Sequence, residues 1–189
     1  MISKNELRKE YKLKRASLDE NFRKLASEKI CMSVLSQGCV KNAKSVMCYN
    51  AINTEVSLDL LMAKMQDNKT LLLPVTDIST QTMHASKLCA LDETELGSYG
   101  ISEPQVKDVF NPSEIDVVIV PALVYNRSGF RIGYGKGYYD KFFSSCKNAI
   151  KIGAAFSCQI ADEHFEEDFD ISVDIIVTEN EIIYCTDNN

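Results

Sequence analysis

The sequence predicts an α/β protein, a three-layer α/β/α sandwich with a mostly parallel central sheet. Its apolar strand segments are continuous rather than alternating, as in sheets that are covered on both faces. Segments with helical periodicity separate these strands, which favours parallel strand order. The chain has 189 residues, the size of one ordinary domain, and contains no internal repeat or low-complexity linker. We therefore predict a single domain over residues 1–189.

Three helices are predicted before residue 70. Apolar residues recur at helical spacing in two successive sets, and the polar run 19–21 separates them. The first set consists of Leu7, Tyr11 and Leu18, and the second of Phe22, Ala26, Ile30 and Val34. The two sets predict a helical hairpin. A third amphipathic set consists of Leu58, Leu61, Met62 and Met65, with Ser57 as the expected N-cap.

Short apolar runs predict the strands of the sheet. These runs cover residues 45–50, 70–75, 82–88, 116–121, 150–156 and 173–177. The clearest is 116–121, which is unbroken and rich in β-branched residues. We expect Pro74 to close the run that begins at Thr70. In such sheets ligands bind in the loops at the carboxyl ends of strands, which directs attention to the segment after Pro121.

The acidic composition argues against a protein that binds nucleic acid through bulk electrostatics. The formal net charge is −6, whereas phosphate neutralisation needs a surplus of Lys and Arg. A small basic pocket for one anionic ligand is still compatible with this charge.

The cysteines and the apolar runs predict a cytoplasmic protein. The seven cysteines are odd in number without CxxC spacing, and the two histidines lie far apart in the sequence. We therefore expect neither a zinc site nor a disulfide scaffold, and free thiols are typical of a reducing cytosol. No apolar run approaches the roughly 20 residues of a membrane span, and we see no signal peptide. Neither a nucleic acid nor a membrane is expected as partner.

A glycine-rich segment at residues 128–140 is the strongest candidate for a binding site. Gly129, Gly133, Gly135 and Gly137 fall within it, although the whole chain has only eight glycines. Glycine lets a ligand approach the backbone closely, and a helix is expected to follow, whose first N–H groups attract anions. Arg131 and Lys136 add two cations, so the segment predicts a site for phosphate groups.

The motif is unusual, and other interpretations of its residues stay open. It is neither a Walker loop nor a dinucleotide fingerprint, and a flexible strand-to-helix connection would also be rich in glycine. One of Tyr138 and Tyr139 is expected to pack onto the sheet and the other to stack on a ligand ring, but the sequence does not say which. Asp140 could hold Mg²⁺ or complement the helix dipole. Asp174 sits in an apolar run, where a carboxylate needs a partner or a metal, unless it faces water at a strand edge.

A basic stripe lies on the first predicted helix. Lys4, Arg8, Lys12 and Arg15 fall on one helix face. A solvated face is the usual explanation of such a stripe, but in an acidic protein it also points to an anionic ligand, because Arg suits bidentate phosphate contacts.

Together these segments resemble the 5-formyltetrahydrofolate cyclo-ligase family, also called methenyltetrahydrofolate synthetase. The most specific part is Gly-Lys-Gly-Tyr-Tyr-Asp at residues 135–140, within a signature over residues 120–140. The segments 4–8, 50–56 and 173–174 resemble the family's opening helix, its folate-contacting segment and its late metal-binding aspartate. Ala122 stands where many members have glycine. Tyr134 stands where some have a second arginine, so the loop lacks one phosphate-binding cation.

The resemblance implies a role for each matching residue. The residues expected at ATP are Lys4, Arg8, Arg131, Ile132, Gly133, Tyr134, Gly135, Lys136, Gly137, Tyr138 and Tyr139. The residues expected at the reduced folate are Asn50, Glu55, Tyr138 and Tyr139, with Glu55 at the pterin. Lys136 and Arg131 are the expected catalytic residues, and Asp140 and Asp174 the expected Mg²⁺ ligands.

The resemblance also implies a reaction and a fold relationship. The reaction would convert 5-formyltetrahydrofolate and ATP, with Mg²⁺, to 5,10-methenyltetrahydrofolate, ADP and phosphate through a phosphorylated formyl oxygen. The fold would be related to that of ribose-5-phosphate isomerase and the CoA transferases, and we expect a monomer. Two alternatives stay open: a sugar-phosphate isomerase-like enzyme on the same fold, which would need no ATP, and a non-catalytic nucleotide- or phosphate-binding module, which would not consume it.

Overall fold

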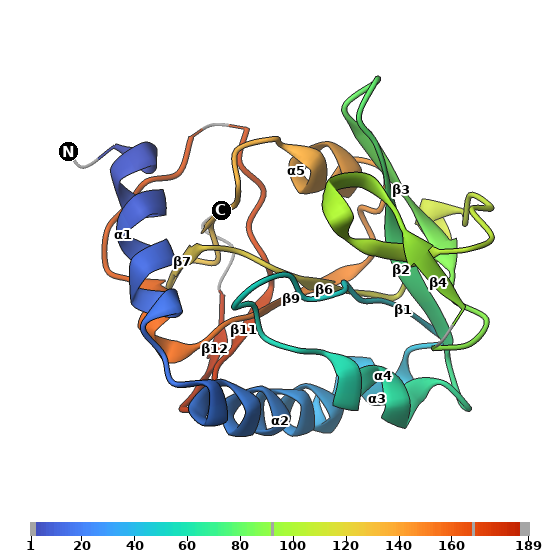
Figure 1. The fold of residues 1–189 in the computed structure, drawn as a ribbon, viewed down its shortest axis with the longest axis horizontal. Coiled ribbons are helices and arrows are strands. Elements are labelled where there is room, and N and C mark those ends of the chain that lie inside the picture. The colour runs from blue at the N-terminus through green and yellow to red at the C-terminus, as the bar shows by residue number, and fades with distance from the viewer. Residues whose placement is uncertain (1–2, 92, 168, 186–189) are drawn as a thin grey trace.

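The protein is built around a seven-stranded sheet in the computed structural model, which describes residues 3–91, 93–167 and 169–185 (Figure 1). The strand order is β12-β11-β9-β6-β1-β2-β3. The inner strands, each parallel to its inner neighbours, are β11 (Ile175–Val177), β9 (Ile150–Ala154), β6 (Val117–Val120), β1 (Ser45–Met47) and β2 (Thr70–Asp77). The antiparallel edges are β12 (Ile182–Tyr184) and β3 (Thr82–Lys87). The predicted α/β class with a mostly parallel sheet is confirmed.

Helices lie on both faces of this sheet. One face is covered by α2 (Glu20–Ser36), α3 (Gly38–Asn42) and α4 (Asp59–Met65), and the other by α5 (Tyr138–Phe143) (Figure 1). Successive residues of a strand point to opposite faces. In β6, Val117 and Ile119 therefore join the core under α2, whereas Val118 and Val120 join the core under α5. This double burial explains why the strand is an unbroken apolar run.

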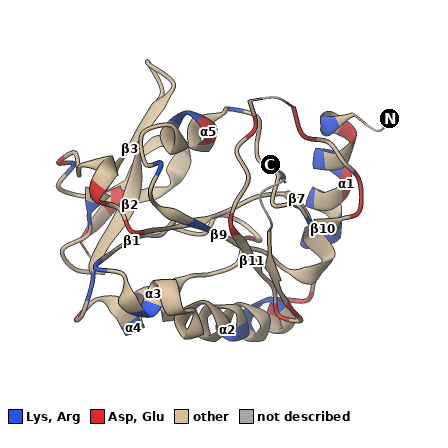
Figure 2. Ribbon diagram, turned by 180° about the vertical axis from the view of Figure 1, so that it is seen from behind, with Lys and Arg blue, Asp and Glu red and all other residues tan. Residues whose placement is uncertain are grey.

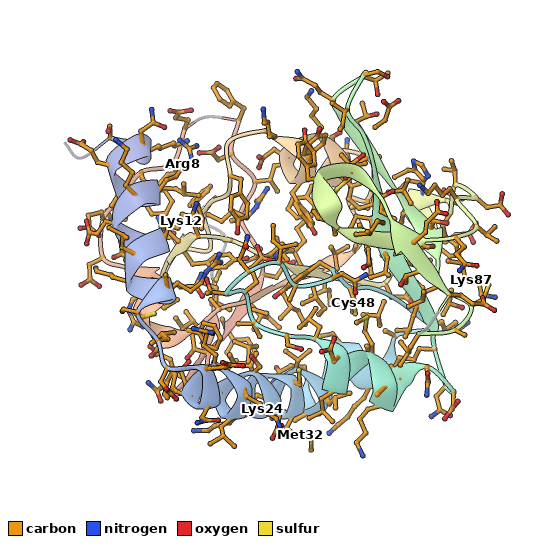
Figure 3. The ribbon with its side chains drawn as sticks, viewed as in Figure 1. Arg8, Lys12, Lys24, Met32, Cys48 and Lys87 are labelled. Carbon is orange, nitrogen blue, oxygen red and sulfur yellow. The ribbon has the colours of Figure 1, made fainter. Side chains whose placement is uncertain are left out.

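Both helices of the predicted hairpin are present, but they run in different directions and do not lie side by side (Figure 1). The start of each helix is capped. The first helix, α1 (Lys4–Ala16), begins with a capping box between Ser3 and Glu6. Asp19 caps α2 by accepting the backbone N–H groups of residues 21 and 22. On the outer face of α2, Lys24 and Met32 point away from the sheet (Figure 3).

The predicted N-cap of α4 is wrong. The capping residue is Leu58, which makes no side-chain cap bond. Ser57 lies one residue before the N-cap position, although its hydroxyl accepts the N–H of Asp59, the first residue of the helix.

Pro74 does not close its strand, contrary to the prediction. β2 continues to Asp77, and Pro74 lies opposite Ala85 of β3. The backbone N–H and C=O groups of Leu72 point toward β1, where the carbonyl accepts the N–H of Cys48. Pro74 lies two residues further along the strand, so its backbone nitrogen points to the same side. The next bond of the parallel ladder would run from the N–H of residue 74 to the Cys48 carbonyl. Proline cannot make it, and β1 ends at Met47.

Two small sheets were not predicted. The strands β10 (Ile160–Ala161), β7 (Val124–Asn126) and β8 (Arg131–Ile132) form one, against which α1 packs through Leu7 and Tyr11. The strands β4 (Thr94–Leu96) and β5 (Ser102–Pro104) form the other. The glycine-rich segment 128–140 therefore does not follow β6 directly, because β7 precedes it, and β8 lies within it.

Within the described residues, no helix has both the length and the apolar character that crossing a membrane requires. The basic residues of α1 are visible as a succession of Lys and Arg positions along that helix (Figure 2).

Candidate active site

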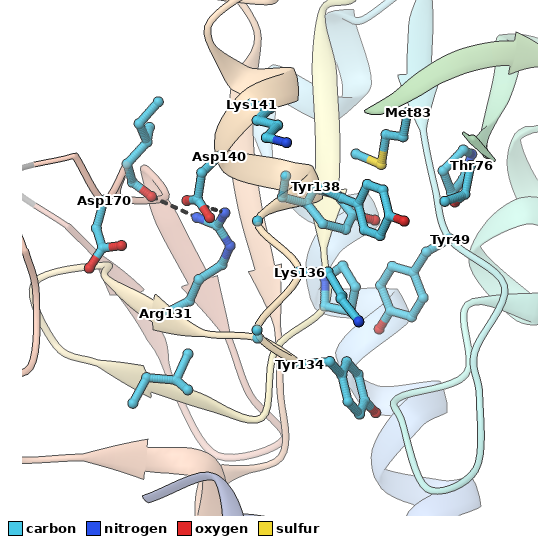
Figure 4. A pocket seen from close by; sticks show the side chains of 18 of the residues that line it. Tyr49, Thr76, Met83, Arg131, Tyr134, Lys136, Tyr138, Asp140, Lys141 and Asp170 are labelled. Atoms are coloured by element: carbon cyan, nitrogen blue, oxygen red, sulfur yellow. Dashed lines mark hydrogen bonds and ion pairs between the residues drawn. The ribbon is translucent and has the colours of Figure 1, made fainter. Parts of the chain in front are cut away.

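A cavity of about 930 Å³ opens where the predicted site residues converge (Figure 4). Its walls come from α1, the segment after β1, the β2–β3 hairpin, the turn between β4 and β5, the segment 131–141, and residues 167 and 169–171. The segments after β1 and β6 lie at the carboxyl ends of parallel strands, where ligands bind in sheets of this kind. The cavity is large enough for a small-molecule ligand.

The structure brings nearly all of the predicted residues to this cavity. The residues that line it are Lys4, Arg8, Asn50, Glu55, Arg131, Ile132, Gly133, Tyr134, Gly135, Lys136, Gly137, Tyr138, Tyr139 and Asp140. Asp174 is not among them.

The loop from Gly133 to Gly137 lies against α1. The Arg8 Nε donates to the Gly133 carbonyl at 3.0 Å. Gly135 and Gly137 have φ of 90° and 69°, in the left-handed region that favours glycine. A Cβ on Gly135 would lie 3.5 Å from the Arg8 guanidinium carbon. The loop therefore keeps its backbone close to the arginine of the first helix.

The cations of the cavity fall into two groups. Lys4 forms ion pairs with Asp170 at 2.7 Å and Glu167 at 3.2 Å. Burial lowers the pKa of Lys4, but the hydrogen bonds to these two carboxylates outweigh burial, and the pKa is raised. By contrast, Lys136 is exposed and Arg8 bonds only neutral groups; neither has a carboxylate partner among the described residues. Lys141, whose Nζ donates to the Gln81 carbonyl at 3.1 Å, also lines the cavity without a carboxylate partner among the described residues. These cations are available to an anionic ligand.

Arg131 lines the cavity, but its guanidinium is bound to the protein. It donates to Asp140 Oδ1 at 2.6 Å and to the Ile171 carbonyl at 2.7 Å. The guanidinium carbon also lies 4.7 Å from the centre of the Phe143 ring. In Figure 4, Arg131 turns toward Asp140 whereas Lys136 extends from the loop into the pocket.

The two expected metal ligands are not brought together at the cavity. Asp140 lines it with a side chain that is 37% exposed, and its Oδ2 accepts no hydrogen bond from the described residues. Asp174 precedes β11, and its Oδ2 accepts the N–H of Lys151 at 2.6 Å. In the described part of the chain, no cluster of three or more His, Cys, Asp and Glu side chains is arranged to hold a metal.

The two tyrosines of the motif have different surroundings. Tyr139 packs against Phe143 with ring centres 5.7 Å apart, on the edge of the core beneath α5. The Tyr138 hydroxyl lies 3.0 Å from the hydroxyl of Tyr99 in the turn between β4 and β5, and this hydrogen bond raises the pKa of Tyr138 to about 12. Tyr139 is thus the tyrosine that packs onto the core, and Tyr138 bridges toward the opposite wall.

Glu55 and Asn50 lie on the wall that follows β1. Burial raises the pKa of Glu55, although the N–H of Ile52 and the hydroxyl of Tyr134 both donate to its carboxylate. The Asn50 amide donates to the Ser102 carbonyl at 2.6 Å and so ties this wall to β5.

Several cavity residues were missed by the sequence analysis. Thr76 lines the cavity from β2, Tyr49 from the segment after β1, and Tyr99 and Asp170 from connections. The rule about carboxyl ends of strands could have indicated Tyr49, which follows β1 directly. No sequence signal indicated Tyr99 or Asp170, because both reach the cavity from irregular segments.

Comparisons with known proteins agree on one family. The model of the 5-formyltetrahydrofolate cyclo-ligase family matches residues 1–179. The 5-formyltetrahydrofolate cyclo-ligase of Mycoplasma genitalium is 29% identical over 94% of this chain and 98% of its own length. That of Haemophilus influenzae is 27% identical over 92% of this chain and 97% of its own length.

Solved structures show the same likeness. The 5,10-methenyltetrahydrofolate synthetase of Aquifex aeolicus superposes with a TM-score of 0.87 at 32% identity, over 98% of this chain and 94% of that one. The synthetase of Mycoplasma pneumoniae shares the fold with a TM-score of 0.77 at 24% identity, over 94% of this chain and 99% of that one. Sequence, fold and cavity thus point the same way, and the chain belongs to the 5-formyltetrahydrofolate cyclo-ligase family.

Proposed function

We propose that the protein closes 5-formyltetrahydrofolate to 5,10-methenyltetrahydrofolate at the expense of ATP, with release of ADP and phosphate. The observation that carries this proposal is the meeting of Arg8 and Lys136, which have no carboxylate partner among the described residues, with the glycine loop in one cavity that also contains Glu55. Membership of the cyclo-ligase family supports it.

The proposed chemistry needs no nucleophile from the protein. The formyl oxygen is an amide-like, poor leaving group, so it first attacks the γ-phosphorus of ATP, and the bond to ADP breaks. N10 of the folate then attacks the activated formyl carbon, phosphate departs with the former formyl oxygen, and N10 loses its proton. The protein must align the formyl oxygen with the γ-phosphate and neutralise the charge that develops there. Lys136 is the best-placed residue for that task, because it extends from the loop into the pocket (Figure 4) and has no carboxylate partner among the described residues.

The other polar residues have supporting places in this proposal. Arg8 and the loop from Gly133 to Gly137 hold the ATP phosphates, and Lys4 joins them when it leaves Asp170. Arg131 orients Asp140, to which it is already bound. Asn50, Glu55 and Tyr138 face the reduced folate, with Glu55 at the pterin.

We place Mg²⁺ at Asp140. Its open carboxylate oxygen is a hard ligand that faces the cavity, and Mg²⁺ is commonly held by one or two carboxylates together with substrate phosphates. When bound, the ion would neutralise phosphate charge. Asp174 stays a prediction from the resemblance, since its carboxylate is engaged by the backbone of Lys151.

The test is spectroscopic. Purified protein with 5-formyltetrahydrofolate and Mg·ATP should develop the near-ultraviolet absorbance of a methenyl folate, with release of one phosphate per turnover. A silent spectrum from a folded sample would contradict the proposal. The same assay separates the alternatives, because a sugar-phosphate isomerase-like enzyme would not depend on ATP and a binding module would release no phosphate.

Four further expectations belong with this proposal. The fold is related to that of ribose-5-phosphate isomerase and the CoA transferases, residues 1–189 form one domain, and the protein acts in the cytoplasm as a monomer. The central parallel sheet with helices on both faces supports the first of these.

A further inference from the structure

We propose that Arg15 and Tyr134 are positioning residues that orient the Glu55 carboxylate toward the reduced folate. This inference rests on the proposed function and deepens it, because it moves Tyr134 from the nucleotide to the folate side of the cavity.

Three side chains from three segments form a continuous hydrogen-bonded chain. The Nη2 of Arg15 donates to the Tyr134 hydroxyl at 2.9 Å, and that hydroxyl donates to Glu55 Oε1 at 3.0 Å. The N–H of Ile52 donates to the other oxygen, Oε2, at 3.0 Å. The carboxylate is therefore held from two directions.

The direction of each bond follows from the chemistry of the groups. A guanidinium can only donate, so the Tyr134 oxygen must accept from Arg15. Its single O–H is then free to point at Glu55, which accepts as a carboxylate. A protonated Glu55 would lose part of this arrangement, so the chain favours the ionised form, whose remaining lone pairs can accept from N–H groups of a ligand.

Arg15 is too deeply buried to belong to the solvated stripe of α1. It is 2% exposed, and its other donors go to Thr54 Oγ1 at 3.0 Å and the Ala122 carbonyl at 3.2 Å. No carboxylate of the described residues lies within ion-pair distance of it. A buried charge without a direct counterion is costly, and the tyrosine hydroxyl connects it to the nearest carboxylate instead.

Steady-state kinetics distinguish an effect of Tyr134 on folate binding from an effect on ATP binding. Initial rates are measured for the wild-type protein and for Tyr134→Phe, with one substrate varied while the other is saturating. We expect the KM for 5-formyltetrahydrofolate to rise about 10-fold, the scale of a lost hydrogen bond to a charged group, while the KM for ATP changes less than about twofold. A rise confined to the KM for ATP would overturn the inference.

The matched control is Tyr184→Phe. The Tyr184 hydroxyl also donates to a side chain, Gln37 Oε1 at 3.1 Å, but it lies outside the cavity lining. Both KM values should stay at the wild-type level in this variant. Circular dichroism of every variant checks that the fold is retained.

A double-mutant cycle tests whether Tyr134 acts through Glu55. In a Glu55→Gln background, Tyr134→Phe should change the folate KM by much less than 10-fold, because the carboxylate is already gone. A second cycle that combines Arg15→Lys with Glu55→Gln should also show non-additive effects on the folate KM. Independent, multiplying effects in both cycles would show that the chain of hydrogen bonds does not position Glu55.

The pH profile gives a readout that a purely structural role would not move. The titratable groups that surround Glu55 are Arg15, Tyr49, Tyr125, Tyr134 and Tyr139. Of these groups only Arg15 is charged near neutral pH. Tyr134→Phe removes a hydrogen bond that lowers the pKa of Glu55. Glu55 should then become protonated at a higher pH, so folate affinity should be lost at a higher pH than in the wild type as the pH falls. An unshifted acid limb would contradict the inference.

Calorimetric binding of 5-formyltetrahydrofolate without ATP keeps the two proposals distinguishable. If the wild-type protein binds the folate but makes no product, the proposed reaction fails while the affinity ratio of Tyr134→Phe to wild type still tests the inference. If the wild-type protein binds no reduced folate, both are overturned.

Discussion

At the scale of single residues, the cations of the cavity differ in what already neutralises them. Arg131 and Lys4 have carboxylate partners at 2.6 and 2.7 Å, whereas Arg8 and Lys136 have none in the described part of the chain. A paired cation is fixed in place, and a ligand must compete for it. An unpaired cation at a cavity wall attracts an anion without that competition.

Lys136→Ala tests this distinction. The side chain is exposed and has no partner among the described residues, so we expect the melting temperature to stay within about 1 °C of the wild type. Turnover should fall about 100-fold or more, the usual effect of removing a group that stabilises developing charge. Lys147→Ala, at an exposed position outside the cavity lining, is the control. Wild-type turnover in Lys136→Ala would show that the loop lysine takes no part in catalysis.

Asp140→Asn tests the proposed metal ligand. The amide keeps an oxygen for Arg131 but loses the charge that attracts Mg²⁺. We expect the Mg²⁺ concentration for half-maximal rate to rise at least about tenfold, measured at fixed ATP. Asp162→Asn, an exposed carboxylate outside the cavity, should leave it unchanged. An unaltered Mg²⁺ dependence in Asp140→Asn would leave Asp140 as a partner of Arg131 only.

At the scale of elements, the glycine loop and the β4–β5 turn hold opposite walls of the cavity by different means. The loop stays close to α1 through the backbone of Gly133 and the positive φ of Gly135. The turn is anchored by the buried Glu103, which accepts the Thr76 N–H at 3.0 Å and pairs with Lys107 at 3.1 Å. Each wall therefore depends on one glycine: Gly135 adopts a positive φ, and Gly97 leaves room for the side chain of Glu103.

Gly135→Ala tests the loop. Its φ of 90° places an L residue in a region that costs about 1–2 kcal/mol, so the loop is expected to change its backbone conformation. We expect the KM for ATP to rise several-fold, measured by initial rates, with little change in the KM for the folate. Gly38→Ala is the control, because no atom lies within 4 Å of its added Cβ. Equal effects on both KM values would contradict a specific role in phosphate binding.

Gly97→Ala tests the turn. A Cβ at this position would overlap the side chain of Glu103, which is 2% exposed. Overpacking of this kind costs about 1–3 kcal/mol, so we expect the melting temperature to fall by about 3–10 °C, measured by thermal denaturation. An unchanged melting temperature would show that the turn is free to move.

At the scale of the whole molecule, the sequence predicted the strands of the seven-stranded sheet better than those of the two small sheets. The run 116–121 was recognisable as a strand because both of its faces are buried. The helix at residues 138–143 was recognisable because it follows the glycine-rich loop. The β7–β8 hairpin was not recognisable, since its strands are only two or three residues long. The site motif was predicted from its own spacing. The pairing of Lys4 with Asp170 and the burial of Arg15 were not, because they depend on segments far apart in the chain.

The cavity joins segments far apart in the chain, so its ligand should stabilise the whole protein. Lys4 and Arg8 come from α1, and Lys136 and Asp140 from the segment after β8. ATP phosphates that bind both would add about 2.7 kcal/mol at 100 times the dissociation constant, which corresponds to a rise in melting temperature of about 5–10 °C for a protein of this size. AMP, which lacks the β- and γ-phosphates, should give a much smaller rise in the same thermal melt. Equal stabilisation by AMP and Mg·ATP would show that the basic residues of α1 and the loop do not hold the phosphates.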